Sequence, residues 1–228
     1  MKLKLLSKRG EISDIKTFVF EPETPISWKA GQYLIYSLPH KNEDLRGKMR
    51  FFTISSSPFE KKPSITTRIS KNKISSFKKA LDNLKIGDMI FAKGPDGDFV
   101  VDDAKNEHIF IAGGIGITPF ISIIKQLNND SSPINVTLLY ANKNQDIPFR
   151  NGLEKIVKTH PEFKIRYFIR PERIDDNSLK NLIKNFKKPI FYVSGPDPMV
   201  EQTEKLLLEL GVKKANIKSD YFSGYKAI

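Results

Sequence analysis

The chain contains no cysteine among its 228 residues. It therefore forms no disulfide and offers no thiolate for an iron–sulfur cluster or a zinc site. Its three histidines are far apart and lack carboxylates at metal-ligand spacing, so we predict no metal site. No apolar run reaches the roughly 18 residues of a membrane span, and residues 1–6 lack the apolar core of a signal peptide. A cytoplasmic location without a membrane span is the expectation.

Acidic residues are too few to balance the basic ones, and the formal net charge is +12. Such a charge is typical of nucleic-acid-binding proteins. The lysines are scattered, however, and no exposed aromatic residues alternate with them at regular spacing. We expect no nucleic-acid partner, and we interpret the charge either as solvated surface or as a surface for an acidic protein or an anionic ligand.

The first half of the sequence shows short β-type segments bounded by Gly, Pro, Asn or Asp. Six strands in this pattern predict a small antiparallel β-barrel. One helix interrupts them, beginning at Ser75 or Ser76. The strands are expected at 3–6, 15–20, 33–37, 50–56, 65–70 and 89–93.

Strands and helices alternate after residue 103, which is typical of a doubly wound parallel sheet. The fold class is thus two domains: the barrel at 1–103 and an α/β domain with a five-stranded parallel sheet at 104–228. Strands are expected at 109–112, 136–140, 163–169, 190–194 and 216–218, and helices at 119–127, 149–159, 178–186 and 198–210.

The segment Gly113-Gly-Ile-Gly-Ile-Thr-Pro119 follows the first strand of the second domain. Glycines allow a phosphate to approach the backbone, and a helix beginning after Thr118 as N-cap would point its positive end at that turn. A purely structural glycine turn is the alternative. The residues expected to bind an anion, most simply a dinucleotide pyrophosphate, are Gly113, Gly114, Gly116, Thr118 and Pro119.

A second motif, Arg50-Phe51-Phe52-Thr53, lies on a barrel strand. Strand alternation puts Arg50 and Phe52 on one side, with Thr53 beside them. Arg50 offers a guanidinium for a phosphate, Phe52 a flat apolar face for a heteroaromatic ring, and Thr53 a hydrogen bond to a ring nitrogen. An amphipathic strand with a core phenylalanine is the alternative interpretation.

These segments together resemble the ferredoxin:NADP reductase-like flavoproteins. Arg50-Phe-Phe-Thr53 is similar to the family's Arg-x-Tyr-Ser/Thr flavin motif, and the glycine segment to its nicotinamide-nucleotide loop. Ser194-Gly-Pro-Asp-Pro-Met199 is similar to its Cys-Gly-Pro-x-x-Met segment. The resemblance extends over nearly the whole chain and implies an FAD-binding barrel followed by an NAD- or NADP-binding domain.

For the barrel, the resemblance implies a flavin held by the Arg50–Thr53 motif, Phe51 included. Arg50 contacts its phosphate, Phe52 packs on it, and Thr53 approaches N5 as a catalytic residue. The helix opened by Ser75 and Ser76 holds the pyrophosphate, which favours FAD over FMN. Arg68 either adds charge there or is a plain surface arginine.

For the second domain, the resemblance implies that Ser194, Gly195 and Pro196 lie near the nicotinamide, that Ser194 is catalytic, and that Met199 covers the site. Lys143 follows the second strand, where it would meet a 2′-phosphate. That favours NADPH over NADH without deciding between them.

The tail Asp220-Tyr-Phe-Ser-Gly-Tyr225 is similar to the Glu-x-Phe-x-Gly-Tyr ending of oxygenase-reductase-like members. Phe222 would then be catalytic and cofactor-binding, on the flavin face that the nicotinamide reaches, or it would simply dock the terminus. Two positions depart from the family pattern: Phe52 stands for tyrosine and Ser194 for cysteine.

The predicted function is a flavin-dependent NAD(P)H oxidoreductase. A hydride passes to FAD, and electrons then pass to a separate acceptor, such as an acidic ferredoxin or flavodoxin, or to a small molecule. The alternative is a flavin-binding electron-transfer or regulatory subunit of a larger redox complex.

Overall fold

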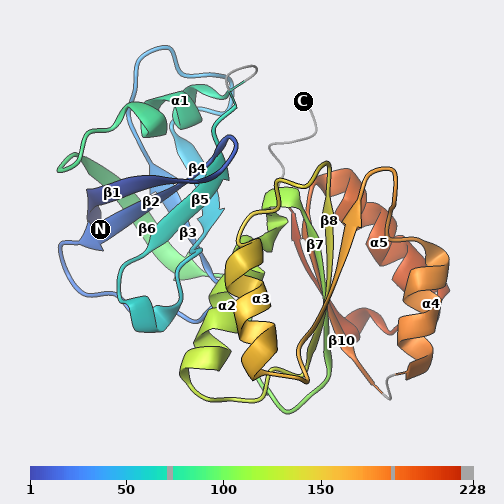
Figure 1. Ribbon diagram of the computed structural model, residues 1–228. Helices are drawn as coiled ribbons and strands as arrows, with labels where there is room; N and C mark the ends of the chain where they lie inside the picture. The colour runs from blue at the N-terminus through green and yellow to red at the C-terminus, as the bar shows by residue number, and fades with distance from the viewer. Residues whose placement is uncertain (71–73, 186–187, 222–228) are drawn as a thin grey trace.

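The computed structural model describes residues 1–70, 74–185 and 188–221. It contains two sheets, each formed by one half of the chain (Figure 1). The prediction of an antiparallel six-stranded barrel followed by a five-stranded parallel sheet is confirmed. No helix in the described ranges is long and apolar enough to cross a bilayer.

The first sheet has the strand order β4-β3-β6-β1-β2-β5 and curls into a half-barrel. Its edge strands approach each other after β4, where the Ser55 N–H donates to the Ser64 carbonyl at 2.9 Å. The half-barrel encloses an apolar core that includes Trp28. Its elements are β1 (Lys2–Ile12), β2 (Ile15–Pro22), β3 (Tyr33–Ser37), β4 (Met49–Thr53), the 3-10 helix η1 (Pro58–Glu60), β5 (Ser64–Arg68), α1 (Ser76–Asn83) and β6 (Met89–Asp96).

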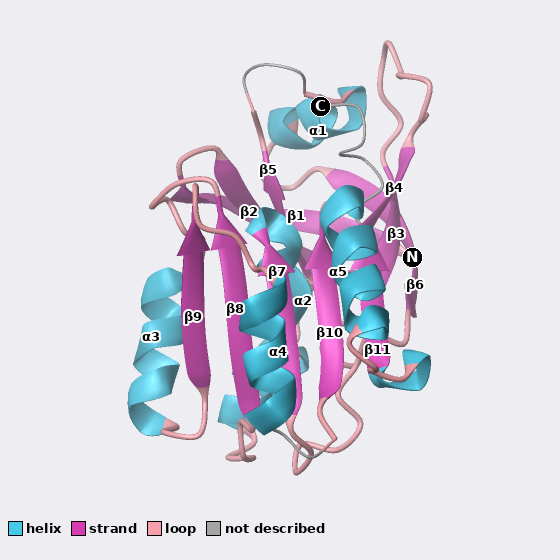
Figure 2. Cartoon of the chain, turned by 90° about the vertical axis from the view of Figure 1, so that its right-hand side faces the viewer, coloured by secondary structure: helices cyan, strands magenta, loops and turns pink. Residues whose placement is uncertain are grey.

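The second sheet is parallel, in the order β11-β10-β7-β8-β9. Helices α2 and α3 cover one face, and α4 and α5 cover the other (Figures 1 and 2). Because neighbouring residues of a strand point to opposite faces, Phe110 packs on the α2 side and Ile111 on the α5 side.

The second half comprises β7 (His108–Gly113), η2 (Gly114–Ile117), α2 (Thr118–Asn129), β8 (Val136–Asn142), α3 (Arg150–Thr159), β9 (Lys164–Ile169), α4 (Asp176–Asn185), β10 (Ile190–Gly195), α5 (Asp197–Glu209), η3 (Lys214–Asn216) and β11 (Ile217–Tyr221). Most predicted elements occur within a few residues of their expected bounds.

The segment after β6 packs with the second sheet rather than the first. The Phe99 ring lies 5.4 Å from that of Phe120 and 5.2 Å from that of Tyr192, and the Tyr192 hydroxyl donates to the Val100 carbonyl at 2.9 Å. The division of the chain into domains at 103 and 104 stays a prediction.

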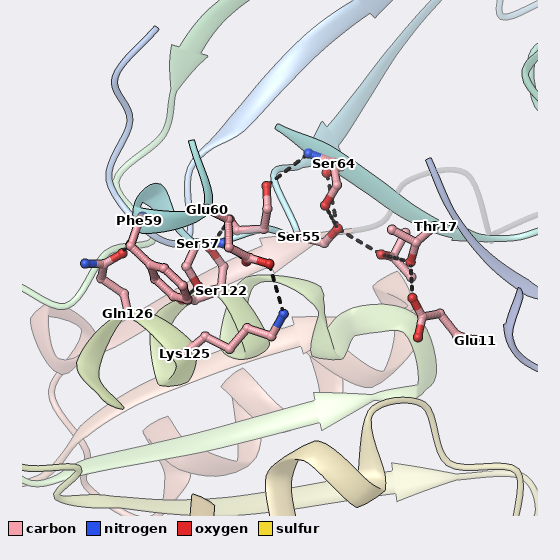
Figure 3. Close-up of polar contacts among 12 residues, drawn as sticks. Glu11, Thr17, Ser55, Ser57, Phe59, Glu60, Ser64, Ser122, Lys125 and Gln126 are labelled. Atoms are coloured by element: carbon pink, nitrogen blue, oxygen red, sulfur yellow. Dashed lines mark hydrogen bonds and ion pairs between the residues drawn. The ribbon is translucent and has the colours of Figure 1, made fainter. Parts of the chain in front are cut away.

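Hydrogen bonds among three serines join the half-barrel to helix α2 (Figure 3). The Ser57 hydroxyl donates to the Ser122 carbonyl at 2.7 Å, and the Ser122 hydroxyl donates to the Ser56 carbonyl at 2.7 Å. Nearby, the Phe59 N–H donates to the Gln126 side chain at 3.1 Å. Since α2 carries both Ser122 and Gln126, the helix is held against the half-barrel by buried hydrogen bonds at Ser122 and by an exposed one at Gln126.

Candidate functional site

The reversal of strand order in the parallel sheet creates the site. The chain runs from β7 outward to β8 and β9 and then returns to β10 on the other side of β7. Open α/β sheets bind ligands where the carboxyl ends of two such strands diverge. A cleft of about 1280 Å³ opens here, and residues of both sheets line it.

The glycine segment after β7 packs directly against the end of β10. A β-carbon at Gly116 would lie 2.3 Å from the Ser194 carbonyl oxygen, and one at Gly113 would lie 2.4 Å from the Met199 sulfur. Gly114 has a φ of 54°, and the buried Tyr140 hydroxyl donates to its carbonyl at 3.0 Å. Gly113 and Gly114 line the cleft, whereas Gly116 lies behind them as a packing position.

Helix α2 begins one residue earlier than expected. The 3-10 turn Gly114–Ile117 continues directly into it, and Thr118 is already helical. The Thr118 hydroxyl donates to the Ile115 carbonyl at 3.2 Å and caps no helix N–H. The prediction of Thr118 as N-cap is therefore wrong, because no extended residue separates the turn from the helix. Thr118 still lines the cleft, while Pro119 is buried and outside the lining.

Thr53 and Ser194, predicted as catalytic on separate domains, converge on one carboxylate. The Thr53 hydroxyl lies 3.4 Å from Oδ2 of Asp220, and the Ser194 hydroxyl lies 3.5 Å from the same oxygen. Both hydroxyls donate, so the end of β4 meets the ends of β10 and β11 at Asp220. Thr53 and Asp220 line the cleft, and Ser194 is fully buried behind them.

The Asp220 carboxyl is poorly solvated. Burial raises its pKa to about 6, although the hydrogen bonds from Thr53 and Ser194 act in the opposite direction. A carboxyl with such a pKa exchanges a proton close to neutral pH. The sequence interpretation gave Asp220 no role. Its place at the glutamate of the tail motif was the signal that would have identified it.

Arg50 lines the cleft, but its guanidinium already has partners. Nη2 donates to Oδ1 of Asp44 at 2.8 Å, and Nη1 donates to two carbonyls of the β3–β4 loop and to the carbonyl of Met49 at the start of β4. Burial opposes the charge of Asp44, yet hydrogen bonds from Arg46 and Ser76 and the Arg50 cation together lower its pKa to about 2. The Arg50 guanidinium, predicted to bind a phosphate, is therefore paired with the Asp44 carboxylate in this conformation.

The two phenylalanines of the β4 motif have different surroundings. Phe52 is partly buried, with its ring 5.8 Å from that of Phe77 and 6.0 Å from that of Tyr36. Phe51 is 62% exposed and makes an edge contact with Tyr33. Both line the cleft, so each presents an aromatic surface to a ligand there.

Ser75 and Ser76, both predicted to open α1 at a pyrophosphate site, have different partners. Ser75 lines the cleft and caps the helix by accepting from the Lys78 N–H at 3.3 Å. Ser76 is engaged instead with the β3–β4 loop, since its hydroxyl accepts from the Asp44 N–H at 2.9 Å. Arg68 lines the cleft and forms an ion pair with Asp14 at 2.6 Å.

The opposite end of the cleft is also basic. Lys143 lines it, together with Arg170 and Arg173 of the segment that follows β9. The two arginines were missed, although adjacent parallel strands must end side by side and the positions after β9 therefore belong with those after β8. Pro196 and Met199 line the cleft too, Gly195 is buried beneath Met199, and Phe222 lies outside the described residues.

The cleft suits phosphate-bearing cofactors. Cationic side chains gather at two places in its lining, one around β4, β5 and α1 and one beyond β8 and β9. Two buried nitrogens of lining residues, Nε of Arg50 and Nδ2 of Asn142, have no acceptor within the described residues. Unpaired buried donors favour an acceptor-rich ligand. In the described ranges, no His, Cys, Asp or Glu residues are grouped to hold a metal.

Comparison with known proteins agrees with this geometry. Residues 2–101 match the family described as the oxidoreductase FAD-binding domain, and residues 110–205 match the oxidoreductase NAD-binding domain. NADH-cytochrome b5 reductase 1 of Aspergillus terreus is 31% identical to this chain in an alignment of 242 positions. The alignment covers 89% of this chain and 80% of that protein. The chain belongs to the ferredoxin–NADP reductase-like family of FAD- and NAD-binding oxidoreductases.

Other relatives are similar over most of this chain. Flavohemoprotein A of Dictyostelium discoideum is 29% identical over 238 residues, covering 94% of this chain but only 58% of that protein. The FAD/NAD-binding domain of nitric oxide dioxygenase from Vibrio cholerae superposes with a TM-score of 0.82 at 24% identity, covering 97% of this chain and 98% of that one. The latter likeness shows the fold alone.

Proposed function

We propose that this protein oxidises NAD(P)H, transferring a hydride to FAD, and that it then passes electrons to a separate acceptor. The observation that carries the proposal is the meeting of Thr53, Ser194 and Asp220 at the cleft between the two sheets. One part of this group comes from the half matched as FAD-binding and another from the half matched as NAD-binding. A site of this kind holds two cofactors against each other.

The lining residues divide between the cofactors. Phe51, Phe52 and Thr53 would hold the flavin, with Ser75 and Arg68 toward its phosphates. Arg50 would contribute there once its guanidinium is shared between Asp44 and a phosphate, since its Nε is unused. Gly113, Gly114, Thr118, Pro196 and Met199 would hold the nicotinamide nucleotide. FAD supplies the hydride-accepting and electron-donating chemistry when it is bound.

The protein contributes placement and a controlled proton. Since the cleft is formed by both sheets, reactants bound to each are held face to face, and that lowers the entropic part of the barrier. The Thr53 hydroxyl would hydrogen-bond the reacting edge of the ring. Asp220, which accepts one hydrogen bond from Thr53 and one from Ser194, would hold or release a proton near neutral pH. Ser194 would keep the carboxylate in place from behind.

The nucleotide preference follows from the basic end of the cleft. Lys143, Arg170 and Arg173 offer positive charge where a ribose 2′-phosphate would lie, and we propose NADPH as the better donor. For the acceptor we propose an acidic ferredoxin or flavodoxin, on the ground of the net charge of +12. A small-molecule acceptor is the other candidate.

The test is an anaerobic absorbance spectrum of the purified protein, followed by parallel titration with NADH and NADPH. A flavin band that bleaches with either nucleotide is expected, and faster bleaching with NADPH would identify the donor. A protein that binds no FAD even on reconstitution, or whose bound flavin is not reduced by either nucleotide, would refute the proposal.

A further inference from the structure

Helix α5 contacts the end of β11 through one carboxylate. Glu204 accepts hydrogen bonds from the hydroxyls of Ser219 and Tyr221, and Nζ of Lys214 lies 3.0 Å from its Oε1. The Glu204 side chain is only 15% exposed. Val200, one turn earlier on the same helix, packs in the core beneath α5, so Glu204 lies at the rim of that core, where α5 covers β11 (Figure 2).

The two hydroxyls belong to the residues on either side of Asp220. Successive side chains of a strand point to opposite faces of the sheet. The pairing with β10 shows which face each one takes. Ser219 stands opposite Val193, which packs on the α5 side, whereas Asp220 stands opposite Ser194, whose hydroxyl it accepts. Glu204 therefore binds β11 from the face opposite to the one that carries the Asp220 carboxyl.

The position of Asp220 in the sheet makes such support necessary. Within the described residues, β11 is an edge strand that pairs with β10 alone, and Asp220 is its next-to-last residue. The ends of edge strands are among the parts of a sheet that open most readily. The contacts of the Asp220 carboxyl with Thr53 and Ser194 are long, at 3.4 and 3.5 Å, and restrain it weakly. Its placement thus depends on how the backbone of β11 is held.

Glu204 can hold the strand because it stays ionised. Burial opposes its charge, but hydrogen bonds from Ser219, Lys214 and Tyr221 together lower the pKa of Glu204. Burial and the hydrogen bond to Glu204 raise the pKa of Tyr221 to about 12, so the Tyr221 hydroxyl remains a donor. Glu204 is therefore an acceptor throughout the pH range in which Asp220 exchanges its proton.

We propose that Glu204 is a positioning residue for the reaction. By binding both neighbours of Asp220 on the α5 side, it holds the Asp220 carboxyl toward the cleft. Glu204 does not line the cleft and acts through β11. The inference rests on the proposed function, because it assigns a further residue to the same site, but the placement of Asp220 can be measured without turnover.

Two variants remove these hydrogen bonds from opposite ends. Glu204→Ala removes the acceptor, and the double variant Ser219→Ala/Tyr221→Phe removes both donors while it keeps an aromatic ring in the cleft lining. Lys214→Met is the matched control, because it removes the third partner of Glu204 and leaves both hydrogen bonds to β11 in place. Each variant is made in the wild-type chain and in the Asp220→Asn chain.

Two measurements on the full chain follow the effect. Carbon-13 NMR of protein labelled at its aspartate carboxyls gives the titration midpoint of Asp220 directly, because that signal is missing from Asp220→Asn. Stopped-flow absorbance of the FAD-loaded chain gives the rate of flavin bleaching by NAD(P)H. The NMR measurement needs no turnover, so it reports on positioning even if bleaching fails.

Glu204→Ala and the double variant should lower the Asp220 midpoint from about 6 by about one pH unit, because a less restrained carboxyl is better solvated. Both should slow flavin bleaching by roughly fivefold to tenfold, because small displacements at a reacting group are costly. In the Asp220→Asn chain the same substitutions should change the rate by less than about twofold. Lys214→Met should leave both readouts at their wild-type values.

Three results would overturn the inference. An unchanged Asp220 midpoint in both variants would show that β11 is held without Glu204. Equal slowing in the wild-type and Asp220→Asn chains would show that Glu204 acts on the fold or on another residue. A shift in Lys214→Met as large as that in Glu204→Ala would assign the effect to charge at η3. Absence of flavin bleaching in wild type would instead reject the proposed function, and the NMR midpoint would still decide this inference.

Discussion

The Thr53 hydroxyl and the Asp220 carboxylate lie 3.4 Å apart although 167 residues separate them in the chain. The contact joins the end of β4 in the half-barrel to the end of β11 in the parallel sheet. It puts a half-buried carboxyl with a raised pKa at the place where the two halves meet. The consequences for stability and for catalysis can be measured separately.

Replacing Asp220 should change how stability depends on pH. Its folded pKa of about 6 lies above the unfolded value of about 3.9, so its protonated form is favoured by folding. That contribution is fully present below about pH 4 and is lost as the pH rises to about 6. At pH 8, Asp220→Asn should therefore be more stable than wild type, by at most about 3 kcal/mol.

Urea unfolding of the FAD-free protein at several pH values measures this difference. The exposed Asp98→Asn is the control, and it should keep the wild-type pH dependence. If the stability of Asp220→Asn fell between pH 4 and 6 as steeply as that of wild type, other groups would cause the fall. The Asp220 carboxyl of the wild-type protein would then be ionised over this whole range, and its pKa would not be raised.

Thr53→Ala should slow flavin reduction by NAD(P)H, because one hydrogen bond at the reacting edge is lost. The net value of such a bond is about 0.5–1.5 kcal/mol, which predicts a rate lower by roughly twofold to tenfold. Thr53→Ser keeps the hydroxyl and should stay close to wild type. Anaerobic stopped-flow absorbance gives both rates, and equal slowing in the two variants would point to packing rather than to the hydroxyl.

Lys143→Glu should reverse the charge met by a 2′-phosphate and lower the preference for NADPH over NADH by roughly tenfold to a hundredfold. The measurement is the ratio of kcat/KM for the two nucleotides. Lys158→Glu in the last turn of α3 makes the same charge change outside the cleft lining and should leave the ratio unaltered. An unchanged ratio in Lys143→Glu would remove this residue from nucleotide selection.

Gly116→Ala should destabilise the protein, because its new β-carbon would lie 2.3 Å from a backbone oxygen that has little room to move. Overpacking of this kind costs about 1–3 kcal/mol. Gly152→Ala in α3 is the matched control, since nothing lies within 4 Å of its added carbon. It should instead stabilise by roughly 0.5–1 kcal/mol. Thermal unfolding of both variants tests the contrast.

Most of the fold could be predicted from the sequence because its signals are local. Alternation in the first half and strand–helix alternation in the second each depend on residues a few positions apart. Ser75 as a cap and the glycine segment after β7 are equally local, and the structure has both where they were expected. Thr118 was misassigned because a 3-10 turn and a helix that follow each other leave no capping residue between them.

The missed parts of the site depend on contacts between distant segments. The tail motif marks position 220, but nothing near it in the sequence shows that β11 will carry the Asp220 carboxyl into a half-buried position beside β4. The partner of Arg50 was missed for another reason: Asp44 is only six positions away, but it lies in a loop without periodicity, and the folded loop brings the two charges to 2.8 Å. Residues on short repeating elements were predictable, whereas partners brought together by tertiary structure were not.

The hydrogen bonds from Ser57 to the Ser122 carbonyl and from Ser122 to the Ser56 carbonyl also limit how this chain can be recombined. Each hydroxyl reaches a backbone carbonyl of the opposite half, so the join depends on main-chain position as well as on side-chain identity. A chimera that takes one half from a relative would inherit a compatible active site only if the η1 turn and α2 also keep their relative spacing. The two halves are therefore better exchanged as a pair than one at a time.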